Sequence, residues 1–583
     1  MRAKGAITRL TLVALLGLSA AAATGCENEA DPQTWVKKLD DTSKRPGALR
    51  RLNEMWRSKL AAANDNRQAP EVRTFLDAAL PAVARAFLEH RDEIATRREA
   101  IVILTDSRDP RAVPALLTAL EFSPGNGDSE RVALSAAQAL KDMDLAQHPQ
   151  KAQIVTRLRA TIDRASGTTG NAPRIREACI QALGRIGDRS VVEDLVRVLK
   201  RPIDQQEILS ARAAADALGE LGDSSQNVVD ALVYGLYLNV RRANAFNNCL
   251  RALVRLGADA SVPRLMATVE GQNLEVQALL QSYASVPGMP PVPDGMREST
   301  AIDVLRNFAD PRAVELLLGL LRNAQTTPNV RGAAAEALAY TGLALPATDA
   351  RKGQIFDAIA QVFRGGTPGG EDDMAPAVAP ALVLLGDPRA VGLITQRLAS
   401  QQLRAANTAA FRIGLLMPLA SAVRRDSFAQ FDREAARTAA DLEALLRESP
   451  DSQREIGQVQ RQLETIRSVA SVARECEDGD LACYTGKLGD RESAVVRKAA
   501  YMIAWTAGAN AAAARTALLA KADHPDPLVR RSIHTALDSL SPSGCPECVT
   551  RLEAVIAAER GQESKSLMHL EAQMLMARMR SRS

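Results

Sequence analysis

The sequence predicts an all-α protein whose helical hairpins stack into an α-solenoid. The pentapeptide Asp-Pro-Arg-Ala-Val occurs three times, beginning at Asp109, Asp310 and Asp387. Similar turns recur at intervals of roughly 35–45 residues, the length of a two-helix repeat. The chain has 583 residues but only 3% aromatic residues, so it exceeds one ordinary core and must rely on close-packed aliphatic helices. Growth by repetition accounts for both properties.

Each pentapeptide is interpreted as the turn between the two helices of a hairpin. The Asp side chain accepts hydrogen bonds from free amides of the second helix, and Pro suits the first helical position. Apolar residues then follow at i, i+3, i+4 and i+7, which is one face of a helix. The Arg is expected to remain free near the turn. The predicted helix-capping residues are Asp109, Asp188, Asp223, Asp310 and Asp387.

The helix before the turn recurs as well. Residues 176–188 read REACIQALGRIGD, residues 211–223 read ARAAADALGELGD, and residues 247–259 read NNCLRALVRLGAD. The Gly near the closing Asp suits a left-handed position at the helix C-terminus. These residues resemble HEAT repeats, in particular the short bacterial type called phycobilisome-lyase-like, over about residues 97–400 and again over about 491–560. The resemblance implies a solenoid with a ladder of Asp and Arg along it, and it implies no particular chemistry.

The N-terminus is typical of an exported lipoprotein. Three basic residues precede an apolar run from Leu10 to Ala23, which is too short to span a bilayer and is typical of a signal peptide. The run leads into ATGC, which resembles the bacterial lipobox, with Ala23 where Leu is usual. The resemblance implies that Cys26 is lipidated and anchors the chain to a membrane of the bacterial cell envelope, on its periplasmic or surface face. An ordinary secretory signal followed by an incidental Cys is the alternative.

Composition and periodicity divide the chain into five segments. The predicted segments are a signal peptide (1–25), a tether with capping helices (26–95), a HEAT-like repeat array (96–429), a long helical hairpin (430–475) and Cys-stapled C-terminal repeats with a cap (476–583). The second helix of the hairpin has a short heptad seam. A coiled coil with a partner needs more heptads, so we expect this seam to pack within the protein.

The charge balance argues against nucleic-acid binding. The formal net charge is +4, and loss of the signal peptide removes three positive charges and leaves +1. A nucleic-acid-binding surface needs a concentration of basic residues. We therefore expect no nucleic acid among the partners.

Four cysteines form two close pairs near the C-terminus. Cys476 and Cys483 flank a short loop, and Cys545 and Cys548 form a C-x-x-C motif. In an exported protein such pairs are typical of disulfides, and we predict the bonds 476–483 and 545–548. A redox role for the C-x-x-C pair and a four-Cys zinc site are the alternatives. Both are less favoured, because no strand-helix-strand pattern surrounds the motif and the first pair is spaced too widely for a zinc knuckle.

No motif predicts a catalytic, metal or cofactor site. The sequence lacks G-x-S-x-G, Walker, G-x-G-x-x-G and H-E-x-x-H motifs. None of the five His residues is followed by Glu, although some solenoids of this repeat type hold two iron ions through His-Glu pairs. We therefore predict no metal and no cofactor.

Taken together, these features predict an exported, lipid-anchored scaffold without catalytic activity. Its concave surface is expected to bind a protein or peptide partner in the cell envelope. The alternative is a thiol-redox or lyase-like enzyme built on the same solenoid, and a purely structural envelope component is a third possibility. Fold resemblance alone does not decide among them.

Overall fold

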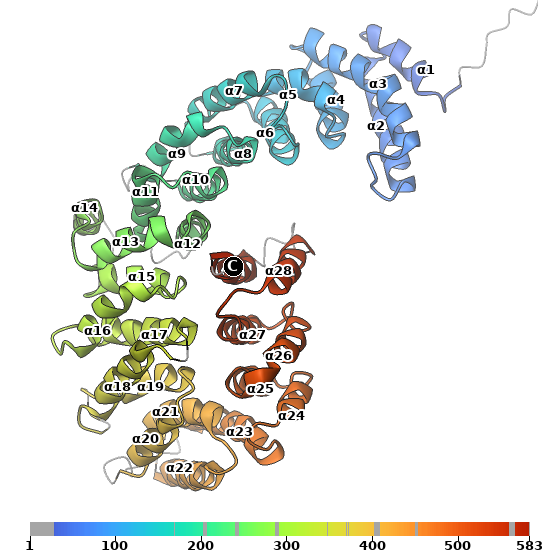
Figure 1. Ribbon diagram of the computed structural model, residues 1–583. Helices are drawn as coiled ribbons and strands as arrows, with labels where there is room; N and C mark the ends of the chain where they lie inside the picture. Colours follow the sequence, from blue (N-terminus) through green and yellow to red (C-terminus); the bar gives the residue numbers. More distant parts are fainter. Residues whose placement is uncertain are drawn as a thin grey trace, which may run out of the picture. The chain divides into compact units, whose positions relative to one another are not determined.

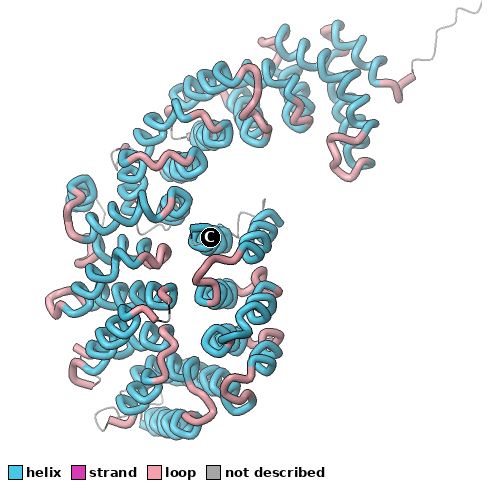
Figure 2. Tube along the Cα trace, in the orientation of Figure 1, coloured by secondary structure: helices cyan, strands magenta, loops and turns pink. Residues whose placement is uncertain are grey.

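A computed structural model describes residues 28–581, apart from residues 168, 202–206, 239–243, 286–290, 347, 369, 371, 401–408, 449–452 and 559–565. Throughout this described part the secondary structure is helical, with 29 α-helices, short 3₁₀ turns and no strand (Figure 2). The predicted all-α class is confirmed. None of the helices found there combines the length and hydropathy needed to cross a membrane. Cys26 lies outside the described residues.

The chain divides into two compact units, residues 1–143 and residues 144–583. The division falls inside the predicted repeat array 96–429, and the five predicted segments stay a prediction. In the first unit, Trp56 and Phe75 form a buried aromatic pair with ring centroids 6.1 Å apart. Its helices are α1 (Pro32–Val36), α2 (Arg45–Ala62), α3 (Pro70–Glu89), α4 (Ile94–Asp106), α5 (Val113–Ala119) and α6 (Gly127–Asp142).

The second unit begins with a long row of helical hairpins, here called the first arm (Figure 1). Its helices are α7 (Lys151–Arg164), α8 (Ala172–Ile186), α9 (Val192–Leu199), α10 (Ile208–Leu221), α11 (Gln226–Tyr237), α12 (Asn244–Leu256), α13 (Ala258–Val269), α14 (Leu274–Ser282), α15 (Met296–Leu305), α16 (Val314–Arg322), α17 (Pro328–Ala344), α18 (Ala350–Arg364), α19 (Ala375–Leu384), α20 (Arg389–Leu398) and α21 (Ala409–Ala422).

A helical hairpin and a shorter row of helices, here called the second arm, complete this unit. The connecting hairpin consists of α22 (Phe428–Glu448) and α23 (Gln453–Glu475). The second arm consists of α24 (Leu481–Lys487), α25 (Ser493–Thr506), α26 (Ala511–Leu519), α27 (Pro527–Ser539), α28 (Pro546–Ala558) and α29 (Ser566–Ser581).

Small residues explain why neighbouring repeats stack closely. A Cβ placed on Gly184 of α8 would lie 2.7 Å from the Cβ of Ala217 on α10, and one on Gly219 of α10 would lie 2.9 Å from the Cα of Ala252 on α12. Both glycines belong to the recurring Ala-Leu-Gly of the sequence. The Gly just before the closing Asp serves differently, since Gly187 ends α8 in the left-handed conformation (φ 71°). The recurring letters therefore encode helix stacking and helix termination.

The inner helices of the second unit form a row whose last helix packs against an early helix of the same unit. Contacts run from α15 through α17, α19, α21, α23, α25 and α27 to α29, and α29 in turn packs against α12 (Figure 1). Further contacts pair α17 with α27 and α21 with α25. The two arms are therefore antiparallel, and the second arm covers the inner face of the first arm from α12 to α21.

A candidate ligand site between the two arms

A cavity of about 530 Å³ lies between the arms of the second unit, here called the inter-arm cavity. Helices from both arms and one residue of the connecting hairpin line it. Its lining residues are Glu336, Tyr340, Pro380, Ala381, Val383, Leu384, Gly414, Met417, Pro418, Ser421, Val469, Ala494, Arg497, Tyr501, Trp505, Leu528, Arg531 and Ser532. The volume falls within the range of about 300–1,000 Å³ typical of small-ligand pockets.

One face of α25 supplies the aromatic and cationic part of the wall. Arg497, Tyr501 and Trp505 follow each other at steps of four residues, so they share one side of the helix. The rings of Tyr501 and Trp505 are stacked, with centroids 6.0 Å apart. Ser532 donates a hydrogen bond to the phenol oxygen of Tyr501 over 3.3 Å. Burial raises the pKa of Tyr501, so the phenol stays neutral in ordinary buffers.

The position of Trp505 depends on a glycine of the opposite arm. Gly386 has φ +73°, and a Cβ placed there would lie 2.6 Å from the indole Nε1 of Trp505. This Nε1 is shielded from solvent and has no hydrogen-bond acceptor among the described residues. The indole also borders a second cavity of about 310 Å³, which includes Asp387 and Pro388 of the third Asp-Pro-Arg-Ala-Val turn. Trp505 therefore borders both cavities, and its Nε1 lies against Gly386 without a hydrogen-bond acceptor among the described residues.

Ion pairs join the arms at one side of the inter-arm cavity. Arg531 of α27 lies 3.8 Å from Glu336 of α17 and 4.0 Å from Glu571 of α29. Its guanidinium also lies over the ring of Tyr340, 5.7 Å from the centroid. Arg306, directly after α15, contacts the same Glu336 at 2.7 Å. Arg531 is thus already balanced by two carboxylates of the protein.

Exposed apolar side chains concentrate at this cavity. Among the residues that the structure describes, Ile94, Leu274, Met417 and Leu528 are the large apolar side chains that are exposed. Two of them line the cavity: Met417 on α21 is 37% exposed and Leu528 on α27 is 51% exposed. They belong to different arms. Exposed apolar surface next to partly used polar groups is typical of a binding site.

A buried lysine joins the second arm to the end of α21. The ammonium of Lys498 on α25 donates to the backbone carbonyls of Ala420, at 2.9 Å, and Val423, at 3.0 Å. A cation is favoured at this helix end, because the last carbonyls of a helix have no partner within it. Burial nevertheless lowers the pKa of Lys498 to about 7, and the charge of Asp478 only partly opposes this.

The predicted capping aspartates lie at the repeat turns, and none of them lines the inter-arm cavity. Each carboxylate accepts the backbone N–H two residues later, at 3.0 Å for Asp109, 2.9 Å for Asp188, 2.8 Å for Asp223, 2.9 Å for Asp310 and 2.9 Å for Asp387. In three of the turns this bond opens a short 3₁₀ turn, and the α-helix proper starts four residues after the Asp. The Asp therefore organises the turn just before the helix.

The expectation of a free Arg in each pentapeptide is wrong. Arg111, Arg312 and Arg389 each donate to the Asp two residues earlier in their own turn. Each also reaches an Asp of the preceding hairpin: Asp77 at 2.8 Å, Asp259 at 3.1 Å and Asp357 at 3.2 Å. The guanidinium has several donors, so it serves both carboxylates at once. Although burial of Asp109 opposes its ionisation, hydrogen bonds from Arg111 hold the pKa of this carboxyl below its usual range.

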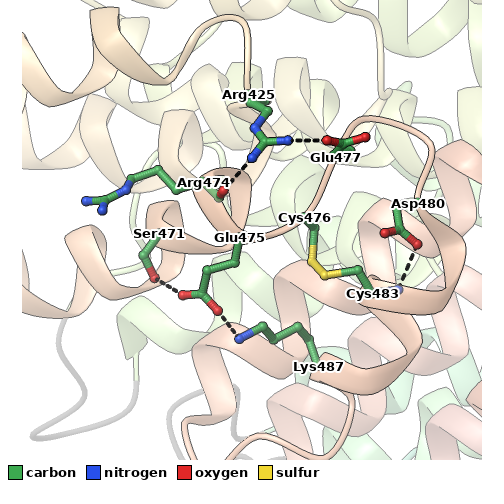
Figure 3. The surroundings of a disulfide bond; sticks show 9 residues. All are labelled: Arg425, Ser471, Arg474, Glu475, Cys476, Glu477, Asp480, Cys483 and Lys487. Atoms are coloured by element: carbon green, nitrogen blue, oxygen red, sulfur yellow. Dashed lines mark hydrogen bonds and ion pairs between the residues drawn. A yellow bond between two sulfur atoms is a disulfide. The ribbon is translucent and has the colours of Figure 1, made fainter.

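The first cysteine pair joins the end of α23 to α24. Cys476 and Cys483 form a disulfide, surrounded by polar contacts (Figure 3). The amide of Cys483 donates to Asp480 over 3.0 Å, and Arg425 holds Glu477 at 2.7 Å. The bond closes the loop where the connecting hairpin passes into the second arm.

The second pair lies at the start of α28. Cys545 and Cys548 form a disulfide, and both residues are buried, with 1% and 0% exposure. Glu547 lies within reach of a common ion with the two sulfurs, but it is exposed and pairs with Arg515 at 3.2 Å. While the sulfurs are bonded to each other they offer no thiolate to a metal. Their burial also keeps a redox partner from reaching them, which favours the structural role.

The sequence analysis did not predict the residues that line the cavity. The one local pattern that could have indicated them is the run RKAAYMIAW, in which an Arg and two aromatic residues share one helix face. In a chain with 3% aromatic residues this concentration is unusual. Nothing local indicates that α17, α21 and α27 meet it.

Comparison with known proteins supports the repeat type. The sequence profile of the PBS lyase HEAT-like repeat matches residues 175–201, which span α8 and α9. No protein with a curated description matches the chain in sequence. The short match identifies the repeat and leaves the function of the whole chain open.

Several solved structures are similar to this chain at low identity. Importin13 in its cytosolic state is 10% identical over 95% of this chain and 77% of that chain, with a TM-score of 0.34. Kap95p, in a structure with RanGDP, is 13% identical over 94% and 66%, with a TM-score of 0.32. Kap121p is 13% identical over 94% and 75%, with a TM-score of 0.21. Scores this low leave the function to be argued from the cavity itself.

Proposed function

We propose that this chain is a lipid-anchored scaffold of the bacterial cell envelope that binds a protein or peptide partner in its inter-arm cavity, without catalysis. The observation that carries the proposal is the composition of the cavity wall. It combines two exposed apolar side chains, Met417 and Leu528, with Arg497, whose Nε has no hydrogen-bond acceptor among the described residues. Covering such a surface with a partner lowers the free energy of the system.

Contacts between the two arms limit the places on the inner face where a partner can bind. The sequence predicted binding on the concave surface of the solenoid, and in the structure helices of the second arm contact the inner helices α12, α17 and α21. The inter-arm cavity is an opening on this inner face that residues of both arms line.

The location rests on the sequence around Cys26. A lipid on this residue would attach the chain to the membrane, with the solenoid in the aqueous compartment. Treatment of the native cells with globomycin, or a Cys26→Ala change, is expected to block processing and to move the protein out of the membrane fraction or leave the precursor uncleaved. Unchanged processing and fractionation under both conditions would refute the anchor.

Site-specific photocrosslinking in the native cell tests the binding role. A photoreactive phenylalanine analogue at Met417 is expected to give a discrete adduct, while the same analogue at Ile94, exposed in the first unit, gives none. Introducing Trp505→Ala should abolish the adduct, because it removes part of the cavity wall. Equal adducts at both positions, or none at Met417, would count against the proposal.

A further inference from the structure

The second arm has an apolar core of its own. The buried apolar residues that form this core lie between Val472 and Met579, and none of its described members belongs to the first arm. Helix α29 contributes Ala572, Leu575, Met576 and Met579 to it. Burial of apolar surface is the main favourable term in folding, so residues that share one core hold together. The second arm, including α29, is therefore a body distinct from the first arm.

The interface between the arms is built differently, because it contains cavities. Three cavities are lined by residues of both arms, and their volumes are about 530, 310 and 340 Å³. Protein interiors are normally close-packed, with few spaces larger than a water molecule. Side chains that border such cavities lack the dispersion contacts that a filled core provides. Two bodies joined by an interface of this kind are free to move relative to each other.

Polar side chains link the arms across this interface. Arg531 of the second arm lies 3.8 Å from Glu336 of α17. Arg578 of α29 donates to Asp538 of α27, at 3.0 Å, and to the backbone carbonyl of Asn307 in the first arm. A partly exposed ion pair or hydrogen bond contributes little net free energy, because water can replace either partner. Breaking these links therefore costs far less than unfolding either arm.

Helix α29 directs two side chains toward the first arm. Met574 and Arg578 are four residues apart, on one side of the helix, and both line the cavity of about 340 Å³. The rest of the cavity wall belongs to the first arm and includes Val254 of α12 and Phe308. Helix α29 is thus packed into the core of the second arm but leaves space where it meets the first arm.

The connecting hairpin lies at the other end of the interface. Its helix α23 contacts α21 of the first arm and α25 of the second arm. Close to it, Lys498 of α25 donates to the carbonyls of Ala420 and Val423 at the end of α21. Along the second arm α25 packs on α27 and α27 packs on α29, so α29 is the helix farthest from the hairpin. A rotation about the hairpin therefore displaces α29 most and the contacts of Lys498 least.

We propose that the second arm is a lid, which opens as one body about the connecting hairpin, and that Arg578 is the clasp that holds it shut. Opening breaks the hydrogen bond from Arg578 to Asn307 and the ion pair between Arg531 and Glu336, while the core of the second arm stays intact. It exposes the inner helices of the first arm from α12 to α21. This inference goes beyond the proposed function, because it concerns the chain without any partner.

Distances between spin labels on the two arms test this inference. Cysteines introduced at Glu315 of α16 and Ala554 of α28, both exposed, carry the labels for pulsed electron paramagnetic resonance. The native free cysteines Cys179 and Cys249 are buried, and Cys26→Ser keeps the N-terminus unlabelled. The wild-type background is expected to give one main distance, because the closed form covers apolar residues of both arms.

Three variants separate opening of the lid from general destabilisation. Arg578→Ala removes a charged hydrogen bond between the arms and should raise the ratio of open to closed molecules about tenfold, seen as a second, longer distance. Glu336→Gln weakens the pair with Arg531 and should raise the same ratio about threefold. Arg580→Ala is the matched control, because Arg580 pairs with Glu553 of α28 inside the second arm. The control should leave the distance unchanged.

A second pair of labels, at Arg491 and Ala554, shows whether the arm moves as one body. Both positions are exposed in the second arm, and their distance should be the same in every variant. One unchanged distance between the arms in Arg578→Ala and Glu336→Gln would overturn the inference. Equal opening in Arg580→Ala, or a changed distance within the second arm, would also overturn it, because the arm would then be unfolding. No partner is present, so the outcome is independent of the crosslinking at Met417.

Discussion

Lys498 makes the stability of the second unit depend on pH in a way that can be measured. Its ammonium is buried between α25 and α21, and it is held by the carbonyls of Ala420 and Val423. Burial lowers its pKa from 10.5 to about 7, and Asp478 is the nearby charge that opposes the shift. Replacing this residue by Met removes the titrating group and keeps most of the apolar length of the side chain.

The sign of the effect follows from proton binding. Between about pH 7 and pH 10.5 the unfolded chain carries a proton on Lys498 that the folded chain has released. The free energy of unfolding therefore rises with pH in this window, by up to about 1.4 kcal/mol per pH unit. From about pH 7.5 to about pH 9.5 this one group adds about 2–3 kcal/mol. Below pH 7 both states are protonated, and the full cost of burying the charge is present.

Urea unfolding followed at Trp505 is the appropriate assay. The chain has three tryptophans, and the ¹⁹F signal of 5-fluorotryptophan at Trp505 reports on the second unit alone. The wild-type chain is expected to gain about 2–3 kcal/mol relative to Lys498→Met between about pH 7.5 and about pH 9.5. The absolute stabilities contain many other titrating groups, so the comparison is between the two profiles.

Parallel profiles of the wild-type chain and Lys498→Met would refute the reasoning. Lys521→Met is the matched control, because it removes a partly exposed Lys from the same arm. Its profile should run parallel to that of the wild-type chain. A divergence of equal size in the control would show that the change in overall charge, and not the buried ammonium, causes the effect.

Three further predictions concern neighbouring features of the second unit. Gly386→Ala should lower the free energy of unfolding by about 1–2 kcal/mol, since it places a Cβ at φ +73° and against the indole of Trp505; a changed ¹⁹F shift of that residue checks it. Replacing both Cys476 and Cys483 by Ser should cost about 2 kcal/mol in urea titrations, because the eight-residue loop is no longer closed; equal midpoints would contradict this. Burial, with Arg530 and Arg578 nearby, lowers the pKa of His534 to about 4. About 3 kcal/mol of the free energy of unfolding should therefore be lost as the pH falls from about 6.5 to about 4. His534→Gln should reduce this loss in urea titrations at acid pH.

Local sequence determined the repeat unit of this protein. Each Asp-Pro-Arg-Ala-Val turn is made by atoms within two residues of one another, as in the bond from the amide of Arg111 to Asp109. The apolar stripe that follows is a property of one helix, and Val113 and Leu116 are fully buried. The all-α class, the turns and the pairing of Cys476 with Cys483 depend on such short separations. Periodicity and spacing reveal interactions of this range.

Tertiary structure alone decided where the solenoid closes and what lines the cavity. Glu336 meets Arg531, and Arg578 donates to the carbonyl of Asn307, across separations of 195 and 271 residues. The path between such residues is the sum of many small rotations between repeats, which local letters do not record. The Arg of each Asp-Pro-Arg-Ala-Val turn, which the sequence predicted to be free, also pairs with a second carboxylate in the preceding hairpin. The sequence by itself determined the repeat unit. Tertiary structure placed Arg497 and Trp505 in one cavity with residues of α21. The physical reason is that each repeat contacts only its neighbours, whereas the meeting of the two arms depends on the summed rotations of many repeats.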